Sequence, residues 1–298
     1  MIRVLVTGAG GQVGAETVRA LEGRAEIVAH DRRTLDLAEP SRIAACIREA
    51  RPHVIVNAAA YTAVDKAESE PDLARAVNAV APGIIAGEAK AIGALLVHFS
   101  TDYVFDGRKR EPYVEDDATA PLGVYGSTKL EGEHAVSQSG CAHITLRTAW
   151  VYGPAGRNFM LTMLRLADQG GTVRVVDDQR GAPTMSARIA RAVVRLMGTC
   201  DAASIDRLKS ASGTYHATAS GETTWHGFAS AIFAQRARSR PGFVAPELLA
   251  ITTAEYPTPA KRPAYSVLSN AKLERTFGVS LGAWQDGLSE ALSVLARG

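Results

Sequence analysis

A tyrosine and a lysine four residues apart carry the clearest chemical signal in the sequence. Tyr125 and Lys129 lie within residues 125–137, which predict a helix, and side chains at this spacing share one helix face. A phenol whose pKa is about 10 is a poor acid at neutral pH, and a neighbouring ammonium lowers that pKa by stabilising the phenolate. Tyr125 is therefore a candidate acid–base catalyst for reducing a carbonyl or oxidising an alcohol, with Lys129 as its partner.

A hydroxyl at the end of a buried strand strengthens this interpretation, because a Tyr-x-x-x-Lys spacing also arises by chance. Residues 95–99 form a short apolar run that predicts a strand, and Thr101 and Asp102 follow it. Ligands of open α/β sheets bind beyond the carboxyl ends of the strands. There the Thr101 hydroxyl can hydrogen-bond the reacting carbonyl oxygen. The alternative is that it only caps the backbone at the strand end.

A glycine-rich turn near the N-terminus predicts the cofactor for such a redox step. Gly8, Gly11 and Gly14 fit Gly-x-x-Gly-x-x-Gly and lie between a predicted strand, residues 3–6, and a predicted helix, residues 13–21. Glycines there permit a sharp turn and bring the first amide groups of the helix close to a pyrophosphate. This context favours a dinucleotide site over a turn that is merely structural.

The residues after the second predicted strand bear on the choice between NAD and NADP. Asp31 lies about twenty positions beyond the turn, where a carboxylate binds the adenosine ribose. Arg32 and Arg33 follow it, and a guanidinium there can hold the 2′-phosphate of NADP through paired hydrogen bonds. Both arginines can equally be solvated surface charges. The sequence leaves the preference open, with a slight inclination to NADPH over NADH.

Alternating short apolar runs and longer helical stretches predict how these groups are positioned. The runs suit strands that are buried on both faces, so we expect an α/β fold with a doubly wound parallel sheet of the Rossmann type. The predicted strands are residues 3–6, 26–30, 53–56, 95–99 and 144–146, and the predicted helices are residues 13–21, 41–50, 72–92 and 125–137, with Ser41 as a helix cap.

The alternation weakens after residue 153, which predicts a second, smaller part of the protein. We expect an NAD(P)-binding domain over residues 1–153 and a mainly substrate-binding, less regular domain over residues 154–298. One more strand, residues 173–176, and one more helix, residues 187–197, predict that a segment of about 172–200 returns to the first domain. The two parts would then interleave.

The composition excludes several classes of function. A formal net charge of +2, with 46% hydrophobic and 21% charged residues among 298, gives no basic surface for nucleic acid or anionic membranes. No run reaches the ~18 apolar residues of a membrane span, and the first residues lack the pattern of a signal peptide. Three scattered cysteines and seven histidines without metal-ligand spacing predict reduced thiols, no metal site and a cytoplasmic location.

Longer stretches resemble the extended short-chain dehydrogenase/reductase family, and within it the dTDP-4-dehydrorhamnose reductase family. The shared features begin with the glycine turn, Thr101 and Tyr125-x-x-x-Lys129. More specific matches are residues 11–14 (GQVG), 54–68 (VIVNAAAYTAVDKAE), 100–107 (STDYVFDG), 147–152 (RTAWVY), 178–184 (DQRGAPT) and 256–263 (YPTPAKRP). The resemblance covers nearly the whole chain. It implies that NADPH or NADH reduces the C4 keto group of dTDP-4-dehydro-L-rhamnose to give dTDP-L-rhamnose.

The resemblance also implies roles for individual residues. Tyr125 would donate the proton, Lys129 would support it and anchor the nicotinamide ribose, and Thr101 would bind the keto oxygen. The sugar pocket would be lined by Asp102 and Trp150, although Trp150 alone reads as a core residue. The cofactor groove would be lined by Gly8, Gly11, Gln12, Val13, Gly14, Asp31, Arg32, Asp36, Leu37, Ala59, Ala60, Tyr61, Tyr125 and Lys129.

Two further features concern the diphosphate and the oligomeric state. Arg262, among prolines, can pair with the substrate diphosphate or stay a surface charge. Some relatives dimerise through a divalent metal held by acidic residues, some of them on the helix after the Gly-Ala-Pro-Thr segment. Residues 185–191 (MSARIAR) have two arginines and no carboxylate there, and hard cations need oxygen ligands. We therefore expect a monomer or a metal-free homodimer that acts on a small nucleotide sugar.

Other functions remain compatible with these motifs. Another nucleotide-sugar 4-ketoreductase would use the same residues. A 4,6-dehydratase typically has an Asp-Glu pair after the threonine, whereas Tyr103 follows Asp102 here, and the epimerase signature is absent from this strand. A non-catalytic NADP-binding regulatory subunit would not need the tyrosine, lysine and threonine, all of which are present.

Overall fold

The centre of the protein is a six-stranded parallel sheet, and the computed structural model describes residues 1–240 and 242–297. The strands lie in the order β2, β1, β3, β4, β5, β10, and every neighbouring pair is parallel. Their bounds are β1 Arg3–Thr7, β2 Glu26–His30, β3 Val54–Asn57, β4 Leu95–Thr101, β5 His143–Thr148 and β10 Gly213–His216. The predicted doubly wound parallel fold is confirmed.

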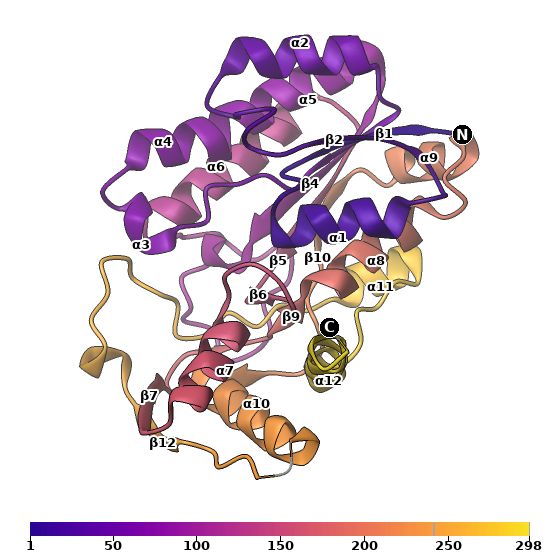
Figure 1. The fold of residues 1–298 in the computed structure, drawn as a ribbon. Coiled ribbons are helices and arrows are strands. Elements are labelled where there is room, and N and C mark those ends of the chain that lie inside the picture. The colour runs from indigo at the N-terminus through magenta and orange to yellow at the C-terminus, as the bar shows by residue number, and fades with distance from the viewer. Residues whose placement is uncertain (241, 298) are drawn as a thin grey trace.

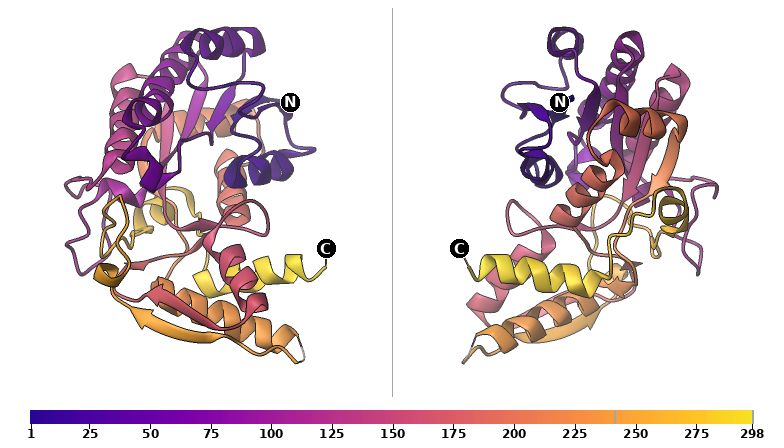
Figure 2. Two further views of the ribbon diagram at one scale, coloured as in Figure 1. Left: turned by 60° about the vertical axis from the view of Figure 1, so that its left-hand side comes forward. Right: turned by 90° about the vertical axis from the view of Figure 1, so that its right-hand side faces the viewer.

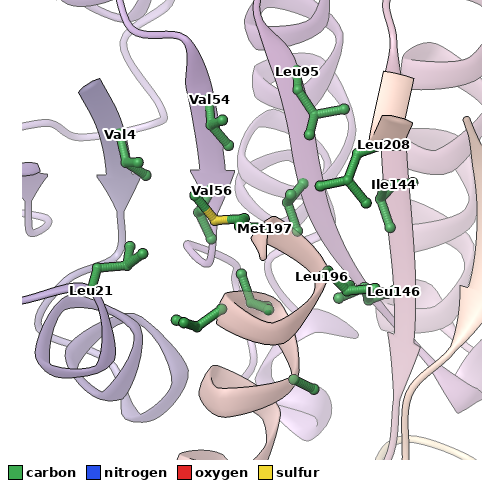
Figure 3. Close-up of a cluster of buried hydrophobic side chains, with 14 of the residues drawn as sticks. Val4, Leu21, Val54, Val56, Leu95, Ile144, Leu146, Leu196, Met197 and Leu208 are labelled. Atoms are coloured by element: carbon green, nitrogen blue, oxygen red, sulfur yellow. The ribbon is translucent and has the colours of Figure 1, made fainter. Parts of the chain in front are cut away.

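Helices cover both faces of this sheet (Figure 1). One face carries α1 (Gln12–Leu21), α8 (Ser186–Met197) and α9 (Ala202–Ser210), and the other carries α2 (Pro40–Ala50), α5 (Ala81–Ile92) and α6 (Val124–Ser139). Figure 3 shows the first of these layers, in which Val56 of the sheet lies near Met197 and Leu146 lies near Leu196 of α8. Because both faces are covered, β3 and β4 are buried at every position, which explains their continuous apolar runs.

The strand order reverses beside β1. The chain leaves β1 toward β2 on one side and later returns to place β3 on the other side. From β3 it continues away from β1, toward β4. The connections after β1 and β3 therefore diverge, and open α/β sheets bind ligands at such a switch point.

A second group of elements gathers at one end of the sheet (Figure 2). It has its own core, in which Met160, Phe228 and Leu288 are fully buried. The elements outside the central sheet and its covering helices are α3 Val64–Ala67, α4 Pro71–Arg75, η1 Ala76–Val80, η2 Asp102–Val104, β6 Val151–Tyr152, α7 Phe159–Gln169, β7 Thr172–Val176, β8 Arg180–Gly181, β9 Thr184–Met185, β11 Thr223–Thr224, α10 Trp225–Ser239, β12 Glu247–Ile251, η3 Thr253–Glu255, α11 Ala271–Phe277 and α12 Trp284–Leu295.

Residues 72–92, predicted as one helix, are interrupted. They form α4, the π-helical turn η1 and α5. Pro82 explains the break, because it has no amide with which to bond the carbonyl of Asn78. Gly132 of α6 lies against that carbonyl, where a Cβ would overlap the oxygen. The π turn therefore lets α6 pack closely on this segment.

Three smaller features of the structure go beyond the sequence analysis or correct it. Helix α2 begins at Pro40 with Glu39 at the cap position, so the prediction of Ser41 as the cap is wrong; proline suits the first helical position, where its missing amide costs no hydrogen bond. Strand β7 forms where predicted but pairs with β12 in a separate two-stranded sheet. Strand β10 was not predicted, because its four residues mix glycine, polar and aromatic side chains.

Candidate active site

The glycine turn after β1 lies directly against the end of β3. Gly8 has a φ of +68°, and a Cβ added there would lie 2.6 Å from the amide nitrogen of Ala59. A Cβ on Gly14 would overlap the carbonyl oxygen of Gly8. Gly11 is the N-cap of α1 and supplies no side chain to bond the first amide groups. These backbone donors are the groups that a pyrophosphate needs.

Gln12 and Val13 begin α1 and connect the turn to the rest of the protein. Gln12 Oε1 accepts a hydrogen bond from Asn158 Nδ2 over 2.9 Å, so the loop after β6 reaches the glycine turn. Val13 packs against the hydrophobic core on the α1 face of the sheet. The start of α1 is thereby fixed by the loop before α7 and by the core of the sheet.

Three buried polar side chains tie together the strands that carry the site. Thr7 Oγ1 donates to Asn57 Oδ1 over 2.6 Å, and Asn57 Nδ2 lies 3.1 Å from His98 Nδ1. Burial holds the pKa of His98 well below its ordinary value, so the neutral ring can accept from the amide. This row fixes β1, β3 and β4 relative to one another near their carboxyl ends.

Asp31 follows β2 and is held in a tight turn. Its carboxylate accepts hydrogen bonds from the amide and the hydroxyl of Thr34, at 2.9 and 3.0 Å, and these bonds lower the pKa of Asp31. The next two side chains are largely exposed, 78% for Arg32 and 87% for Arg33. Arg32 lies 3.5 Å from Asp36, and Arg33 lies 4.0 Å from Asp31. Pairs this exposed contribute little, so both guanidiniums are free to reorient.

The remaining residues predicted for the cofactor groove differ in what they expose. Ala59 and Ala60 are partly exposed just beyond β3. Tyr61 is fixed beside them by Asn78, whose side chain accepts from the Tyr61 amide and donates to the Tyr61 carbonyl. The side chain of Leu37 is buried in the core between the sheet and α2. Only its backbone is available to a ligand.

Tyr125 begins α6 beside the end of β4, and a glycine sets how closely the two approach. A Cβ on Gly126 would overlap the carbonyl oxygen of Tyr103, so a larger residue would push the first turn of α6 away. The rings of Tyr103 and Tyr125 meet edge to face at 5.6 Å. Burial raises the pKa of Tyr125 to about 12, and the nearby Thr101 hydroxyl partly offsets this rise. The structure therefore brings the phenol and the threonine together.

Lys129 lies on the next turn of α6 and is buried. Its Nζ donates to the carbonyl oxygen of Phe99 over 2.6 Å. Burial lowers the pKa of Lys129 to about 8, and the carboxylate of Glu133 opposes this shift. The predicted lowering of the Tyr125 pKa by Lys129 is wrong for this structure, because the ammonium is held at Phe99 and burial dominates around the phenol.

Two interactions that were not predicted hold α6 in place. The guanidinium of Arg147 forks onto the carboxylate of Glu133 with contacts of 2.9 and 2.7 Å, and both side chains are buried. Asn78 also donates to the Thr128 hydroxyl over 3.2 Å, which links α6 to the loop at Tyr61. An arginine within an apolar strand was the only sequence signal for the first pair. The link through Asn78 depends on the π turn and left no signal.

Asp102 is a buried carboxyl group beside the candidate catalytic threonine. Thr101 Oγ1 donates to Asp102 Oδ1 over 2.9 Å. Burial raises the pKa of Asp102 to about 6, so the group is mostly ionised at neutral pH and accepts this proton. The pair lies at the carboxyl end of β4, where Thr101 is in register with Thr148 of β5.

Trp150 and Arg262 have partners that the sequence did not indicate. Trp150 is only partly buried and stacks on the indole of Trp225, with ring centroids 3.5 Å apart, so it is not a core residue. Arg262 donates to both carboxylate oxygens of Asp65, at 3.0 and 2.8 Å. Its pairing with a diphosphate stays a prediction.

The structure also bears on metals, membrane spans and other hollows. Among the residues that it describes, no three or more His, Cys, Asp or Glu side chains are grouped to hold a metal ion, and no helix is long and apolar enough to cross a membrane. Two surface hollows of about 710 and 720 Å³ lie elsewhere, one at the amino ends of the strands and one beside α8. Neither contains a residue of the candidate active site.

Comparison with known proteins places the chain among nucleotide-sugar reductases. A model of the family described as RmlD substrate binding domain matches residues 2–297. The dTDP-4-dehydrorhamnose reductases of Burkholderia thailandensis and Escherichia coli K12 are 46% and 41% identical in sequence to this chain. These alignments cover 95% and 99% of this chain and 96% and 98% of the relatives. The chain belongs to the dTDP-4-dehydrorhamnose reductase family.

Solved structures of this family agree with the fold. A dTDP-4-dehydrorhamnose reductase from Clostridium acetobutylicum superposes with a TM-score of 0.90 at 39% sequence identity. The match covers 99% of this chain and 100% of the Clostridium chain. The reductase from Bacillus anthracis, solved in complex with NADP, has a TM-score of 0.90 at 34% sequence identity. This match covers 98% of this chain and 99% of the Bacillus chain. Another relative, 42% identical over 97% of this chain and 94% of its own, is a probable dTDP-4,6-dihydroxy-2-methyloxan-3-one 4-ketoreductase from Streptomyces antibioticus.

The close packing of the glycine turn predicts the effect of one methyl group on this family member. Gly14→Ala should weaken NADPH binding by roughly tenfold or more, because the added Cβ overlaps the Gly8 carbonyl and displaces the start of α1. Titration of NADPH fluorescence measures this affinity. Gly87→Ala is the matched control, since no atom lies within 4 Å of a Cβ at that helical position. Equal affinities for the two variants would show that the turn does not contact the cofactor.

Proposed function

We propose that this protein is an NADPH-dependent reductase that converts the C4 keto group of dTDP-4-dehydro-L-rhamnose into the hydroxyl group of dTDP-L-rhamnose. The position of Tyr125 beside the carboxyl end of β4 carries the proposal: its ring meets that of Tyr103, two residues after Thr101, and this end lies two strands from the glycine turn. The names of the relatives support the substrate, and NADP in the Bacillus anthracis reductase supports the cofactor.

The glycine turn fits a dinucleotide. Its backbone passes so close to Ala59 and to its own Gly8 carbonyl that a Cβ on Gly8 or Gly14 would collide with them, and such a bare backbone can approach a pyrophosphate. The amide groups of Gln12 and Val13 would bind the pyrophosphate, and Gly11, whose own amide donates to the Gly8 carbonyl, would let the backbone approach it. The adenosine side would be bound by Asp31, Arg32, Asp36, Ala59, Ala60, Tyr61 and the backbone of Leu37. Tyr125 and Lys129 would bind the nicotinamide ribose. When bound, the reduced nicotinamide supplies a hydride to C4 of the sugar.

The protein's own part in the reaction is to bind the keto oxygen and protonate it. Tyr125 would donate a hydrogen bond to this oxygen as negative charge develops on it. Thr101 would donate a second one once its hydroxyl turns from Asp102 toward the substrate. With a pKa of about 12, Tyr125 keeps its proton at neutral pH until the oxygen becomes basic enough to take it. Hydride and proton together complete the alcohol. Lys129 would stabilise the phenolate that Tyr125 leaves behind only after its ammonium turns from the Phe99 carbonyl toward the phenol.

The second part of the protein would bind the nucleotide sugar. We divide the chain into an NAD(P)-binding domain, residues 1–153 with a return segment at about residues 172–200 that includes α8, and a mainly substrate-binding domain over residues 154–298, the two being interleaved. The packing of α8 in the core of the central sheet supports this division, as does the separate core of α7, α10 and α12. Asp102 and Trp150 would line the sugar pocket. Arg262 would reach the diphosphate only by leaving Asp65.

A monomer or a metal-free homodimer fits the surface of α8. Arg188 and Arg191 both pair with Glu290 of α12 in the same chain, at 3.1 and 2.6 Å. The carboxylate at this surface is therefore already neutralised by arginines rather than available to a divalent cation.

A second candidate is the reduction of another nucleotide-linked keto sugar by the same residues. The relative from Streptomyces antibioticus favours it, because a differently named ketoreductase is 42% identical to this chain. Dehydration is disfavoured, since the position after Asp102 holds Tyr103, whose burial raises its pKa far above neutrality, and not a glutamate.

Removal of one hydroxyl group tests the proposed chemistry. Tyr125→Phe should lower kcat by about 10²–10⁴-fold, because the keto oxygen loses its proton donor, while NADPH binding is retained. NADPH oxidation with dTDP-4-dehydro-L-rhamnose measures the rate. Tyr256→Phe, at an exposed tyrosine, is the matched control and should leave kcat unchanged. A Tyr125→Phe enzyme with near-normal kcat would remove Tyr125 from the reaction.

The pKa of Lys129 predicts the pH dependence. Burial lowers this pKa to about 8, so the ammonium loses its proton as the pH rises through that value. We expect kcat/KM for the keto sugar to decline over the same range. The Lys129→Arg variant keeps its charge, so this decline should be missing from its profile even if its rate is lower. A wild-type profile that stays level well above pH 8 would contradict the role of the charged lysine.

The two exposed arginines predict the cofactor preference. The double change Arg32→Ala, Arg33→Ala should lower kcat/KM for NADPH and leave NADH nearly unaffected, because only NADPH carries the 2′-phosphate. A charge-assisted hydrogen bond contributes roughly 1.5–3 kcal/mol, about 10- to 150-fold. Asp31 repels the same phosphate, so the effect should lie near or below tenfold. Both cofactors must be compared at fixed ionic strength. Equal losses for both would show that the arginines do not bind the phosphate.

A further inference from the structure

Two tryptophans from distant parts of the chain form a face-to-face stack. The indole planes of Trp150 and Trp225 are within 4° of parallel, their centroids are 3.5 Å apart, and both side chains are partly exposed. Aromatic pairs ordinarily prefer offset or edge-to-face arrangements with centroids about 4.5–7 Å apart. Surrounding contacts must therefore hold this pair in full overlap.

Trp150 is fixed from the backbone side. Its φ is +47°, a conformation that residues with a Cβ rarely adopt unless their surroundings impose it. Its carbonyl oxygen accepts a hydrogen bond from the Thr184 amide over 3.1 Å. Its indole lies over Gly181, where any Cβ would overlap the ring. Trp225 covers one face of the ring, and the missing side chain of Gly181 leaves room for its edge that carries Nε1.

Trp225 is fixed from the second part of the protein. It is the first residue of α10, and its Nε1 donates to Gln179 Oε1 over 3.2 Å. Gln179 is buried and donates in turn to the Thr253 hydroxyl over 3.0 Å. The ring of Phe159 lies 4.7 Å away on a further side. The single hydrogen-bond donor of the Trp225 ring is therefore already used, which leaves an apolar surface.

The stack lies beside the reacting end of the sheet. Thr148 ends β5 in register with Thr101 of β4, and Trp150 follows two residues later. The stack therefore joins the strand ends that carry the candidate catalytic threonine to helix α10 of the second part. A rigid apolar wall in this place suits the C–H face and the methyl group of a deoxyhexose, which offer no hydrogen bonds.

We propose that Trp225, held by Gln179, positions Trp150 and makes the stack the wall that selects a 6-deoxyhexose over a hexose with a 6-hydroxyl group. This inference rests on the proposed function as a nucleotide-sugar ketoreductase. The Trp225 donor is used by Gln179, and Trp150 Nε1 lies against Gly181, so a 6-hydroxyl group on the rest of the two indoles would lose its bonds to water without a partner. An apolar pocket discriminates against an added hydroxyl group by about 10²-fold, which bounds the selectivity that the stack can supply.

The test compares Trp225→Leu with wild type on two substrates, a dTDP-linked 4-keto-6-deoxyhexose and its 6-hydroxy counterpart. Leucine keeps an apolar side chain but removes the stack. We expect KM for the deoxy substrate to rise by roughly tenfold and the kcat/KM ratio between the substrates to fall by roughly tenfold, with NADPH affinity unchanged. Trp225→Phe retains a ring and should lie between wild type and Trp225→Leu. Trp284→Phe, a buried tryptophan in the same core, is the control and should leave the ratio unchanged.

A second readout does not need turnover. In Trp284→Phe all tryptophan emission comes from the stack, since the chain has three tryptophans. Addition of dTDP-L-rhamnose should change this emission, and the Trp225→Leu change in the same background should weaken the binding by roughly tenfold. An unchanged substrate ratio in Trp225→Leu, or an equal loss of NADPH affinity, would overturn the inference. A wild-type enzyme that reduces neither substrate would overturn the proposed function instead, and the emission change would then still decide whether the stack binds a deoxyhexose.

Discussion

The close approach of helix α6 to the sheet is the constraint on which the rest of the site depends. Gly126, Lys129 and Gly132 are spaced three residues apart and share one face of this helix. The two glycines lie against the carbonyl oxygens of Tyr103 and Asn78, and the lysine between them bonds the carbonyl of Phe99. Three carbonyl groups thus set the depth of α6. Tyr125 lies beside the end of β4 only because the first turn of α6 approaches this closely, since one Cβ at Gly126 would overlap the Tyr103 carbonyl and one at Gly132 would overlap that of Asn78 in η1.

This depth requires charged groups to be buried, and the structure satisfies them in pairs. The Lys129 ammonium donates to the Phe99 carbonyl oxygen, and the Glu133 carboxylate accepts two hydrogen bonds from the Arg147 guanidinium. An unpaired buried charge costs several kcal/mol, and even a well-made buried pair often stabilises no more than apolar packing would. The Glu133–Arg147 pair is therefore better explained by what it orients than by stability. It fixes the turn of α6 that follows Lys129, and its carboxylate opposes the loss of the lysine's proton.

The sequence predicted the parts of this site that depend on local rules. Strands β3 and β4 were predicted because burial on both faces requires apolar residues throughout, and the glycine turn because no other residue fits beside Ala59. Contacts between distant segments could not be predicted. Asn78 acts through a π turn that requires α6 as a neighbour, and Trp225 meets Trp150 across 75 positions of sequence. The pKa of Tyr125 depends on where Lys129 points, which its spacing on a helix does not determine.

The two parts of the protein therefore divide the work of recognition and reaction. The groups proposed to move a proton lie on β4 and α6, where the sheet, the buried row from Thr7 to His98 and the carbonyl contacts leave little freedom. The groups proposed to select the sugar lie on the segment after β5 and on α10, whose contacts are side chains stacked or hydrogen-bonded across a boundary. Side chains at such a boundary can be exchanged without disturbing α6. Such a separation of reacting and sugar-selecting residues would allow relatives to act on different keto sugars, and one relative is indeed named for a different one. Reaction type follows from the rigid part, and substrate choice from the residues that face it.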